Sequence, residues 1–597
     1  MKKRNVIFLV IDSLSYKTLQ SYPFPDELFL NNYIKKHSIV YDNVYTQGPY
    51  TEASMNGLAY GQRGLDGSAF MFSHAKFSHS FVDNLHADYL TFCSGMSCRL
   101  FVDHSKKSFD KYHYHFYTPT TLPTLQWNRV DHFCKLYQSR KLTKDEKGCL
   151  VKLIRYSLDD TESFLNSLKS KEYETSLSNN YVRLSDVDLL LKKVQIAKKN
   201  FTNNQDSFLD FVLRKEIDFS KFDFNYYVPY NDINDQKMIF DKYRPLLIKE
   251  AKKHYSFRLK SILNFNSNLF HSFLNTKSFT KNLVKVLLSS SRKRKNLESV
   301  YSALLKPDSN KKRAISFDRC ITEIKKLIED NDNEKKPFFI YCQPDDFHPT
   351  SVFWTYDSPD DANLESELSS ALSLAKRIKL KNCNIFDYLS IKYIDSKINE
   401  LFNILQKNNK LDDTDVIITA DHGSWSFNDY VRMDDNLIMS EERMHIPCLF
   451  FRNGQPELHD TNLHNSYSIP NTILSFVGYP PDNYFYGKPF EIDSNKYLLS
   501  ENLGFGCPDI FNVPINYVVH NQRYKLNIKV GIEETITEKN CVGFYDLVKD
   551  PLEEINIISK IKKINKTLFL EMFNVAANRH SELQSNTSKE DFYDFRF

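Results

Sequence analysis

Short runs of β-branched and aromatic residues recur along the chain and predict buried strands. Five of them are apolar at successive positions: Val6–Ile11, Tyr89–Cys93, Phe338–Tyr341, Val416–Thr419 and Cys448–Phe451. Strands that are apolar on both faces are typical of a parallel sheet covered by helices. Helical periodicity lies between them, for example at Ile385–Leu405, where Ile391, Ile394 and Ile398 keep a spacing of three to four residues. The alternation predicts an α/β sandwich with a central, mostly parallel sheet.

Between residues 105 and 330 the pattern changes to long, Lys-rich helical periodicity without matching strands. The helical segments are Leu150–Leu168, Ser185–Leu213, Asp241–Leu263 and Lys281–Lys293. We predict a large helical insertion that is carried on a loop of the sheet. Its most basic point is Ser291–Lys295. A solvated helix end explains this run better than a polyanion contact, although both interpretations stay open.

After residue 490 strands return, now short and partly alternating. They are Tyr497–Leu499, Tyr517–His520, Tyr524–Val530 and Val542–Leu547, and a helix at Ser559–Ala576 follows. This pattern predicts a small antiparallel sheet with one helix. The predicted organisation is a catalytic domain at 1–104 and 331–490, a helical insertion at 105–330 and a C-terminal α+β subdomain at 491–597.

Composition excludes several classes of protein. The 597 residues are 41% hydrophobic and carry a net charge of only +4, which gives no reason to expect a nucleic-acid partner. The opening apolar run, Val6–Ile11, is ended by Asp12 and is shorter than the roughly 7–15 residues of a signal-peptide core. No stretch approaches the roughly 20 apolar residues of a membrane span. The ten cysteines are scattered, so we expect no disulfide framework and a cytoplasmic location.

Candidate chemistry lies at the ends of two predicted strands. Asp12 follows the first strand, and Asp421 and His422 follow the strand that ends at Ala420. Ligands of open α/β sheets bind at the carboxyl ends of strands. Taken alone, each residue is more typical of a helix cap or a turn. Because two strand ends share the same pattern, a site for a hard or borderline divalent cation is favoured.

A third candidate is Thr51, which opens the helical segment Tyr50–Gly61. A helix N-terminus offers free N–H groups and a positive end, and both suit a phosphate or sulfate. The alternative is that Thr51 is an N-cap, an everyday role for threonine. Without further context, the N-cap interpretation is the better one.

Taken together, these segments resemble the alkaline phosphatase/sulfatase superfamily. Asn5–Leu14 and Thr419–Gly423 are similar to its two metal motifs, and Phe338–Tyr341 with His348 resembles a strand and a substrate-binding histidine. Asp42–Thr46 is similar to the segment before the nucleophile. Later matches are Arg443–Phe451, Ile469–Gly478, Phe544–Leu547 and Asp550–Asn556. The resemblance covers about residues 1–100 and 335–560, in the right order, and implies a sulfatase/alkaline-phosphatase-like sandwich.

The segment at the nucleophile departs from the sulfatase pattern. Sulfatases carry a Cys or Ser followed by x-P-S-R, which directs conversion to formylglycine. Here Thr51 takes the first place, Ala53 replaces Pro, Ser54 matches, Met55 replaces Arg and Gly61 keeps the spacing. A threonine nucleophile is similar to that of nucleotide phosphodiesterases and of phosphoethanolamine and phosphoglycerol transferases. The resemblance therefore favours phosphorus over sulfur chemistry.

The implied function is that of a metal-dependent phosphoryl-ester hydrolase or phosphotransferase that acts on a phosphodiester-type substrate through a phosphothreonine at Thr51. The implied ligands of one divalent ion (Mn, Zn or Ca) are Asp12, Thr51, Asp421 and His422. His348 and His445 are candidates for holding the ester oxygens or protonating the leaving group, and a structural role is nearly as well supported for each. The expected substrate is a small-molecule or glycan phosphate or sulfate ester.

A second cation could be held by Asp345, Asp346 and His348, with His445 or His464. The spacing from Asp345 to His348 is one residue shorter than the D-x-x-x-H of two-zinc relatives, so the second site stays open. Two alternatives for the whole protein are a sulfate-ester hydrolase on the same fold and an inactive carbohydrate- or phosphate-binding or assembly protein. The insertion is expected to overhang the site as a lid, or to form a homo-oligomer.

Overall fold

The structure is a computed structural model. It describes residues 3–66, 79–95, 109–114, 136–167, 184–213, 317–330, 336–344, 385–423, 439–493, 495–503 and 509–588, with scattered residues at 130, 133–134, 242, 246, 366, 369–370 and 372–375. The predicted helix at Lys281–Lys293 and the basic run after Ser291 lie outside these residues, and so does the predicted helix at Asp241–Leu263 except for residues 242 and 246.

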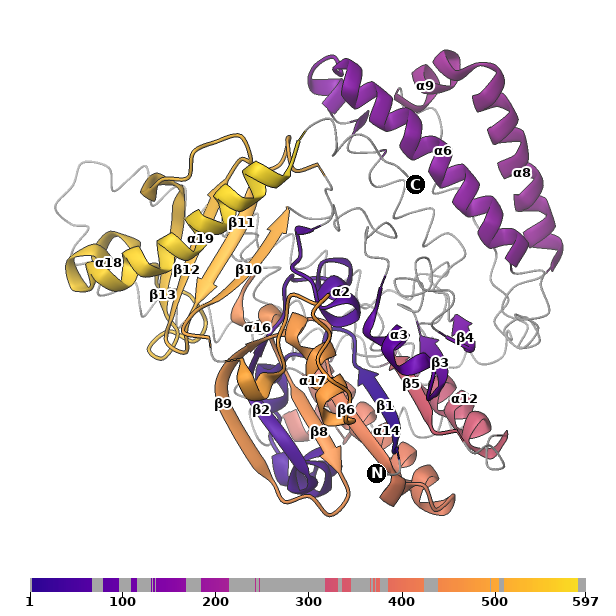
Figure 1. Cartoon of the computed structure of the whole chain (residues 1–597), viewed down its shortest axis with the longest axis vertical. Coiled ribbons are helices and arrows are strands. Elements are labelled where there is room, and N and C mark those ends of the chain that lie inside the picture. Colours follow the sequence, from indigo (N-terminus) through magenta and orange to yellow (C-terminus); the bar gives the residue numbers. More distant parts are fainter. Residues whose placement is uncertain are drawn as a thin grey trace.

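The described part of the chain contains one large sheet and one small sheet, with helices packed around them (Figure 1). The large sheet has the order β4-β3-β5-β1-β6-β8-β2-β7, and β9 pairs with β2. The strands from β4 to β6 are parallel, whereas β8 runs antiparallel to β6 and β2. Their bounds are β1 Asn5–Val10, β2 Ser38–Tyr45, β3 Leu90–Gly95, β4 Lys111–Tyr114, β5 Phe338–Gln343, β6 Thr414–Thr419, β7 His445–Ile446, β8 Cys448–Arg452 and β9 Leu458–Asn465. The predicted central, mostly parallel sheet is confirmed.

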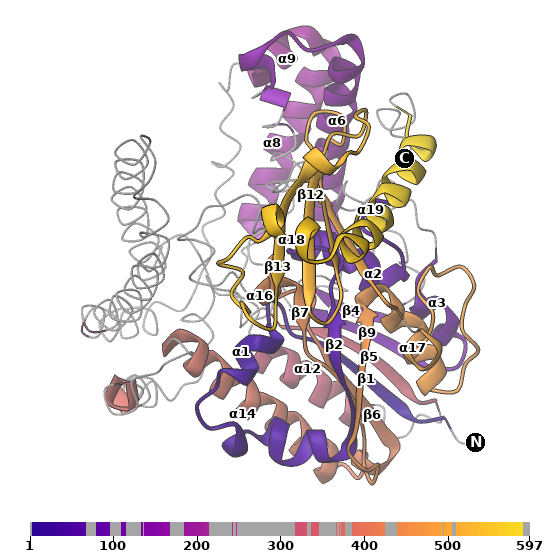
Figure 2. The same cartoon turned by 90° about the vertical axis from the view of Figure 1, so that its left-hand side faces the viewer.

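Helices cover both faces of this sheet (Figure 2). One layer contains α12 (Phe317–Asp330) and α14 (Ile385–Lys407), and the other contains α2 (Thr51–Tyr60), α3 (Phe81–His86) and α17 (Ile469–Phe476). The central strands are buried between the two layers because they are apolar on both faces. The apolar run at the N-terminus is one of these strands, β1. Within the described ranges, no helix is both long and apolar enough to cross a membrane.

The insertion contains long helices that lie beyond the carboxyl ends of the parallel strands, at the same end of the molecule as α2 (Figures 1 and 2). They are α6 (Lys144–Ser167), α8 (Leu184–Asn203) and α9 (Gln205–Leu213). The prediction that the region holds no strand is wrong at β4, which pairs with β3. The helix α12, which falls within the predicted insertion, packs on β3 and β5 of the large sheet.

The C-terminal part forms a four-stranded antiparallel sheet of β10 (Leu498–Leu503), β11 (Ile515–His520), β12 (Tyr524–Val530) and β13 (Cys541–Asp546). The predicted single helix is two, α18 (Ile558–Ile564) and α19 (Lys566–Asn586). The break falls at Asn565, whose side chain accepts a hydrogen bond from the Leu568 N–H and caps α19. The predicted α+β character of this part is otherwise confirmed.

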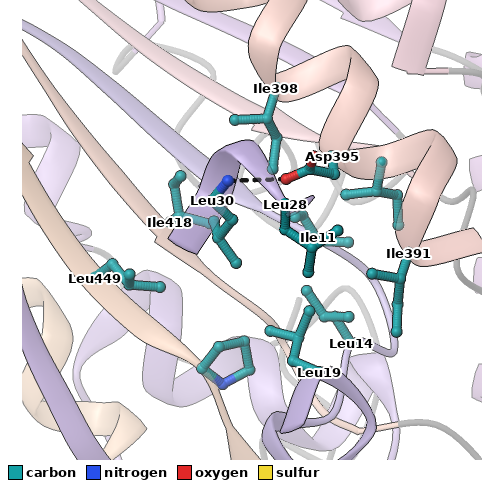
Figure 3. Close-up of a pocket in the computed structure, with 12 residues that line it drawn as sticks. Ile11, Leu14, Leu19, Leu28, Leu30, Ile391, Asp395, Ile398, Ile418 and Leu449 are labelled. Carbon is teal, nitrogen blue, oxygen red and sulfur yellow. Dashed lines mark hydrogen bonds between the residues drawn. The ribbon is translucent and has the colours of Figure 1, made fainter. Parts of the chain in front are cut away.

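A small apolar cavity lies between the large sheet and α14 (Figure 3). Its volume is about 10 Å³, which is room for one water molecule at most. Among its lining residues only Asp395 has a polar side chain, and both carboxylate oxygens accept backbone N–H groups, from Phe29 and Leu30. This cavity is a packing defect and is too small to be a substrate pocket.

A buried lysine of the small sheet, Lys525, contacts residues of the catalytic domain. Lys525 of β12 donates a hydrogen bond to the Met439 carbonyl at 2.5 Å and lies 2.7 Å from Glu553 Oε1 and 3.8 Å from Glu441 Oε1. Lys525 and Glu553 are both buried. A buried charge without a partner is costly because it has lost its hydration. Removing any one of these charged groups should therefore destabilise the fold.

Lys525→Met should therefore destabilise the protein by about 3–5 kcal/mol, since it leaves buried carboxylates without their cation. Lys496→Met is the matched control, because Lys496 is exposed and its ion pair with Glu571 is in solvent. Denaturant unfolding checks the difference. If the two variants unfold at the same denaturant concentration, the buried contacts of Lys525 do not stabilise the protein.

Candidate active site

Two carboxylates and an imidazole meet at the carboxyl edge of the large sheet. β1 and β6 are parallel neighbours in register up to Val10 and Thr419, so Asp12 and Asp421 follow at the same level. Asp12, Asp421 and His422 offer ligand atoms that all lie within 4.8 Å of one another, and all three residues are buried. The structure thus brings together the residues that were predicted from the two strand ends.

The turn after Asp12 directs backbone donors to the acidic pair. Ser13 has a left-handed backbone (φ 64°), a conformation that costs free energy for a non-glycine residue. In this conformation its N–H donates to Asp421 Oδ1 at 3.0 Å, while its hydroxyl donates to Asp12 Oδ1 at 2.6 Å. Ser13 therefore contacts both carboxylates.

The orientation of His422 is set by its neighbour. Its Nδ1 lies 2.8 Å from the Gly423 carbonyl, which can only accept, so Nδ1 carries the proton. Nε2 then presents its lone pair toward Thr51, 3.3 Å from Oγ1. A side chain at Gly423 would place its Cβ 1.8 Å from the Glu442 carbonyl oxygen, so only glycine fits here. This arrangement leaves Nε2 in the form that binds a metal ion.

Thr51 is the first residue of α2, and its side chain does not cap the helix. The N-cap position belongs to Tyr50, which has an extended backbone and makes no side-chain capping bond. The Thr51 hydroxyl instead lies 3.2 Å from Asp12 Oδ2 and 3.3 Å from His422 Nε2. The N-cap interpretation of Thr51 is therefore wrong, and the hydroxyl belongs to the cluster of Asp12, Asp421 and His422.

The segment before Thr51 is held by the C-terminal sheet. Ser500 of β10 donates its hydroxyl to the Thr46 carbonyl at 2.9 Å, and Tyr50 donates its hydroxyl to Asn502 Oδ1 at 2.9 Å. These contacts join residues that are more than 450 positions apart in the sequence. The position of Thr51 therefore depends on both domains.

Burial and mutual repulsion make the acidic pair unfavourable on its own. Desolvation, and to a lesser extent the nearby Asp12 charge, raise the pKa of Asp421 to about 6, against the opposing effects of His422, the Ser13 N–H and the Thr51 hydroxyl. Two carboxylates, one imidazole and one hydroxyl form a donor set that suits a borderline divalent cation. The residues present therefore fit a metal ion, which would relieve the repulsion between Asp12 and Asp421.

His445 lies in a different environment. Its Nε2 donates to the Asp42 carbonyl at 2.7 Å, and its ring is stacked on Tyr16 and Tyr45, with ring centroids 4.3 and 4.6 Å away. Burial lowers its pKa to about 4, so the ring is neutral near pH 7. His445 thus lies where β7 pairs with β2. Its catalytic role stays a prediction.

Two of the five residues predicted for a second cation site, His445 and His464, lie within the described part of the chain. Asp345, Asp346 and His348 lie outside the described residues. His464 is buried against Tyr41 and Phe490, and its Nε2 is 3.3 Å from Asp460 Oδ2. Within the described part of the chain, Asp12, Asp421 and His422 form the one group of three or more His, Cys, Asp or Glu residues that is close enough to hold a metal ion.

One site residue was missed by the sequence analysis. Gln343 ends β5 and donates its amide Nε2 to Asp421 Oδ2 at 3.2 Å. The rule that selected Asp12 and Asp421, a polar residue at the carboxyl end of a buried strand, also applies to Gln343.

Comparison with known proteins gives one family match. The sulfatase family model matches residues 258–479, a range that includes Asp421 and His422. No curated protein matches the sequence.

Several solved structures are similar to this chain at low sequence identity. Phosphonate monoester hydrolase of Agrobacterium radiobacter is 11% identical over 97% of this chain and 96% of its own, with a TM-score of 0.47. A protein of the alkaline phosphatase superfamily from Vibrio parahaemolyticus is 12% identical over 100% and 90%, with a TM-score of 0.43. A protein solved with its substrate D-glucosamine-2-N,6-O-disulfate is 13% identical over the whole of both chains, with a TM-score of 0.43.

Residues 258–479 are thus similar to the sulfatase family, and this range carries Asp421 and His422 of the site at the ends of β1 and β6.

The raised pKa of Asp421 makes the stability of the metal-free protein depend on pH. A carboxyl whose pKa is higher in the folded than in the unfolded state destabilises the fold once it ionises. In the presence of EDTA, Asp421→Asn should therefore melt at a higher temperature than the parent at pH 8. The gap should close as the pH falls through about 6 toward 3.8, the ordinary value for Asp.

Added Mn²⁺ or Zn²⁺ should reverse this order, because the parent can bind the cation through Asp421 and the variant cannot. Differential scanning fluorimetry over pH, with and without metal, measures both effects. A parent that melts above Asp421→Asn in EDTA at pH 8 would show that the carboxylate pair carries no electrostatic cost.

Proposed function

We propose that the protein is a metal-dependent phosphoryl-ester hydrolase or phosphotransferase. It acts on a phosphodiester-type substrate through a covalent phosphothreonine at Thr51. The observation that supports this most directly is the placement of the Thr51 hydroxyl, 3.2 Å from Asp12 and 3.3 Å from His422, at the N-terminus of a ten-residue helix. A helix N-terminus favours negative charge, as a phosphoryl group in transfer requires.

The proposed metal ligands are Asp12, Thr51, Asp421 and His422. A bound divalent cation, Mn, Zn or Ca, supplies the positive charge that stabilises the threonine alkoxide and the non-bridging oxygens of the ester. The protein sets the positions of these groups. Ser13 donates hydrogen bonds to both carboxylates, and the Gly423 carbonyl accepts one from the imidazole.

In the first step Thr51 Oγ1 forms a bond to phosphorus while the bond from phosphorus to the leaving oxygen breaks. The hydroxyl proton passes to Asp12 Oδ2, the nearest acceptor. The leaving oxygen takes a proton from a general acid. Of the two candidates, His348 and His445, His348 is preferred, because His445 is neutral near pH 7 and its Nε2 proton is donated to the Asp42 carbonyl.

In the second step a water molecule or an acceptor hydroxyl attacks the phosphorus and gives its proton to the same general acid. The bond from phosphorus to Thr51 then breaks, and Thr51 recovers its proton from Asp12. Water gives hydrolysis, whereas an alcohol acceptor gives transfer. The insertion helices lie at this end of the sheet, and we propose that they form a lid that favours transfer by excluding water (Figure 1).

A sulfate-ester hydrolase on the same fold is the second candidate, and the match to the sulfatase family favours it. Against it stands the sequence at the nucleophile. Thr51 with Ala53 and Met55 lacks the Cys or Ser and the x-P-x-R that conversion to formylglycine requires. Phosphate chemistry needs no such conversion.

Thr51→Ala should abolish turnover of bis-p-nitrophenyl phosphate while leaving the fold and most of the metal affinity, because Asp12, Asp421 and His422 remain. Thr51→Ser should keep a reduced activity, since it retains the hydroxyl but loses the methyl group that fixes the side-chain rotamer. Steady-state kinetics on metal-loaded protein, with mass spectrometry of the Thr51 peptide for a phosphate adduct, measures both.

The parent protein tested on p-nitrophenyl sulfate provides the comparison with the second candidate. Hydrolysis of the sulfate ester alone would replace phosphate by sulfate chemistry. A Thr51→Ala variant with the parent rate on the phosphodiester would rule out the covalent mechanism.

A further inference from the structure

Two side chains on β5 form a chain of hydrogen bonds that ends on Asp421. Tyr341 and Gln343 are two residues apart, so they point to the same face of the sheet. The Tyr341 hydroxyl donates to Gln343 Oε1, and Gln343 Nε2 donates to Asp421 Oδ2 at 3.2 Å. Tyr341 and Gln343 are completely buried, so water does not compete for these bonds.

The direction of this chain follows from donor and acceptor chemistry. An ionised Asp421 can only accept, so the amide nitrogen of Gln343 has to face it. The amide oxygen then faces Tyr341, whose hydroxyl has to donate. Tyr341 thus selects the amide orientation in which Gln343 is a donor to Asp421 and is not itself a metal ligand.

Gln343 contacts the carboxylate oxygen that faces the candidate metal position. Asp421 Oδ1 accepts the backbone N–H groups of Ser13 and His422, at 3.0 and 2.7 Å. Asp421 Oδ2 is the oxygen nearer to His422 Nε2, at 3.6 Å. The Gln343 amide is thus a side-chain donor to this second oxygen, and it restricts the rotation of the carboxylate.

The Tyr341 side chain makes two further contacts. It packs edge-on to Phe8 of β1 with ring centroids 5.7 Å apart, and its hydroxyl lies 3.7 Å from the Met55 sulfur of α2. Met55 occupies the place where the sulfatase pattern has an arginine. The helix that begins at Thr51 therefore contacts the same hydrogen-bond chain that reaches Asp421.

We propose that Tyr341 and Gln343 are positioning residues for the metal site, which hold Asp421 Oδ2 in the orientation that binds the cation. This inference rests on the proposed function only in requiring a divalent cation at Asp12, Asp421 and His422. It does not depend on whether the ester is a phosphate or a sulfate. Residues that hydrogen-bond to metal ligands typically change metal affinity by about 10–100-fold when they are replaced.

The first variant is Gln343→Met, which keeps the length of the side chain and removes the amide. Calorimetric titration of the full-length, metal-free protein with Mn²⁺ and with Zn²⁺ should show affinity weakened by about 10–100-fold. Tyr341→Phe keeps the amide but frees it to turn, so a smaller loss in the same direction is expected. Tyr517→Phe is the matched control, because Tyr517 is equally buried and its hydroxyl is hydrogen-bonded to His580, away from the site.

The double variant Tyr341→Phe/Gln343→Met separates positioning from stability. Gln343→Met alone removes the amide acceptor of the buried Tyr341 hydroxyl, leaves it the weaker Met55 sulfur at 3.7 Å, and should lower the melting temperature in EDTA. The double variant removes that hydroxyl and should recover much of the melting temperature, whereas the metal affinity should stay as weak as in Gln343→Met. A purely structural role would instead restore both.

Parent-like metal affinity in folded Gln343→Met, or metal affinity that recovers together with the melting temperature in the double variant, would overturn the proposal. A parent that binds neither Mn²⁺ nor Zn²⁺ would overturn it as well. Turnover of bis-p-nitrophenyl phosphate by the parent is measured in parallel. A parent that binds metal without turnover contradicts the proposed function alone, and the affinities of the variants still decide the role of Gln343.

Discussion

The site depends on the burial of two carboxylates side by side. Asp12 and Asp421 are both excluded from solvent, and the cost of this arrangement appears in the raised pKa of Asp421. The surrounding structure supplies donors that reduce the cost without removing it, namely the left-handed Ser13, the amide of Gln343 and the hydroxyl of Thr51. A divalent cation would compensate the remaining charge. The same pair therefore explains the unusual backbone at Ser13 and the fit of the site to a metal ion.

The second constraint is the path of the chain into Thr51. The segment turns sharply at Gly48, where a Cβ would lie 2.2 Å from the Cβ of Ala53 in the first turn of α2. The small sheet holds both sides of the helix. β10 contacts the residues before Thr51, and Glu501 accepts the Leu65 N–H at 2.7 Å beyond the end of α2. Glu501 is in turn paired with the buried Arg579 of α19. The C-terminal subdomain is thus part of the active-site scaffold.

Much of the large sheet could be predicted from the sequence, because strands buried on both faces form continuous apolar runs. β1, β5, β6 and β8 were predicted within two residues of their ends. β2 and β9 were missed, since they lie toward the edge of the sheet and carry polar residues such as Asp42 and Asp460. β4 was missed because it is short and follows the start of a region dominated by helical periodicity.

The candidate site was predictable as far as local position determines chemistry. Asp12, Asp421 and His422 were found because each follows a strand, and neighbouring parallel strands bring their ends together. At Thr51 the local pattern favoured a helix cap, and only the family resemblance indicated a nucleophile, because the surroundings of its hydroxyl depend on Asp12 and His422 across the fold. The surroundings of His445 depend in the same way on Tyr16 and Tyr45, which no local pattern connects to it.

The central claim is that the Thr51 hydroxyl and one divalent cation act on the same phosphoryl group. A crystal structure of the protein with Mn²⁺ and orthovanadate tests it most directly. The account predicts anomalous density for manganese within about 2.0–2.6 Å of Asp12, Asp421 and His422 donors, with vanadium bonded to Thr51 Oγ1. Manganese bound elsewhere, or vanadate held by other residues with Thr51 unmodified, would contradict the account.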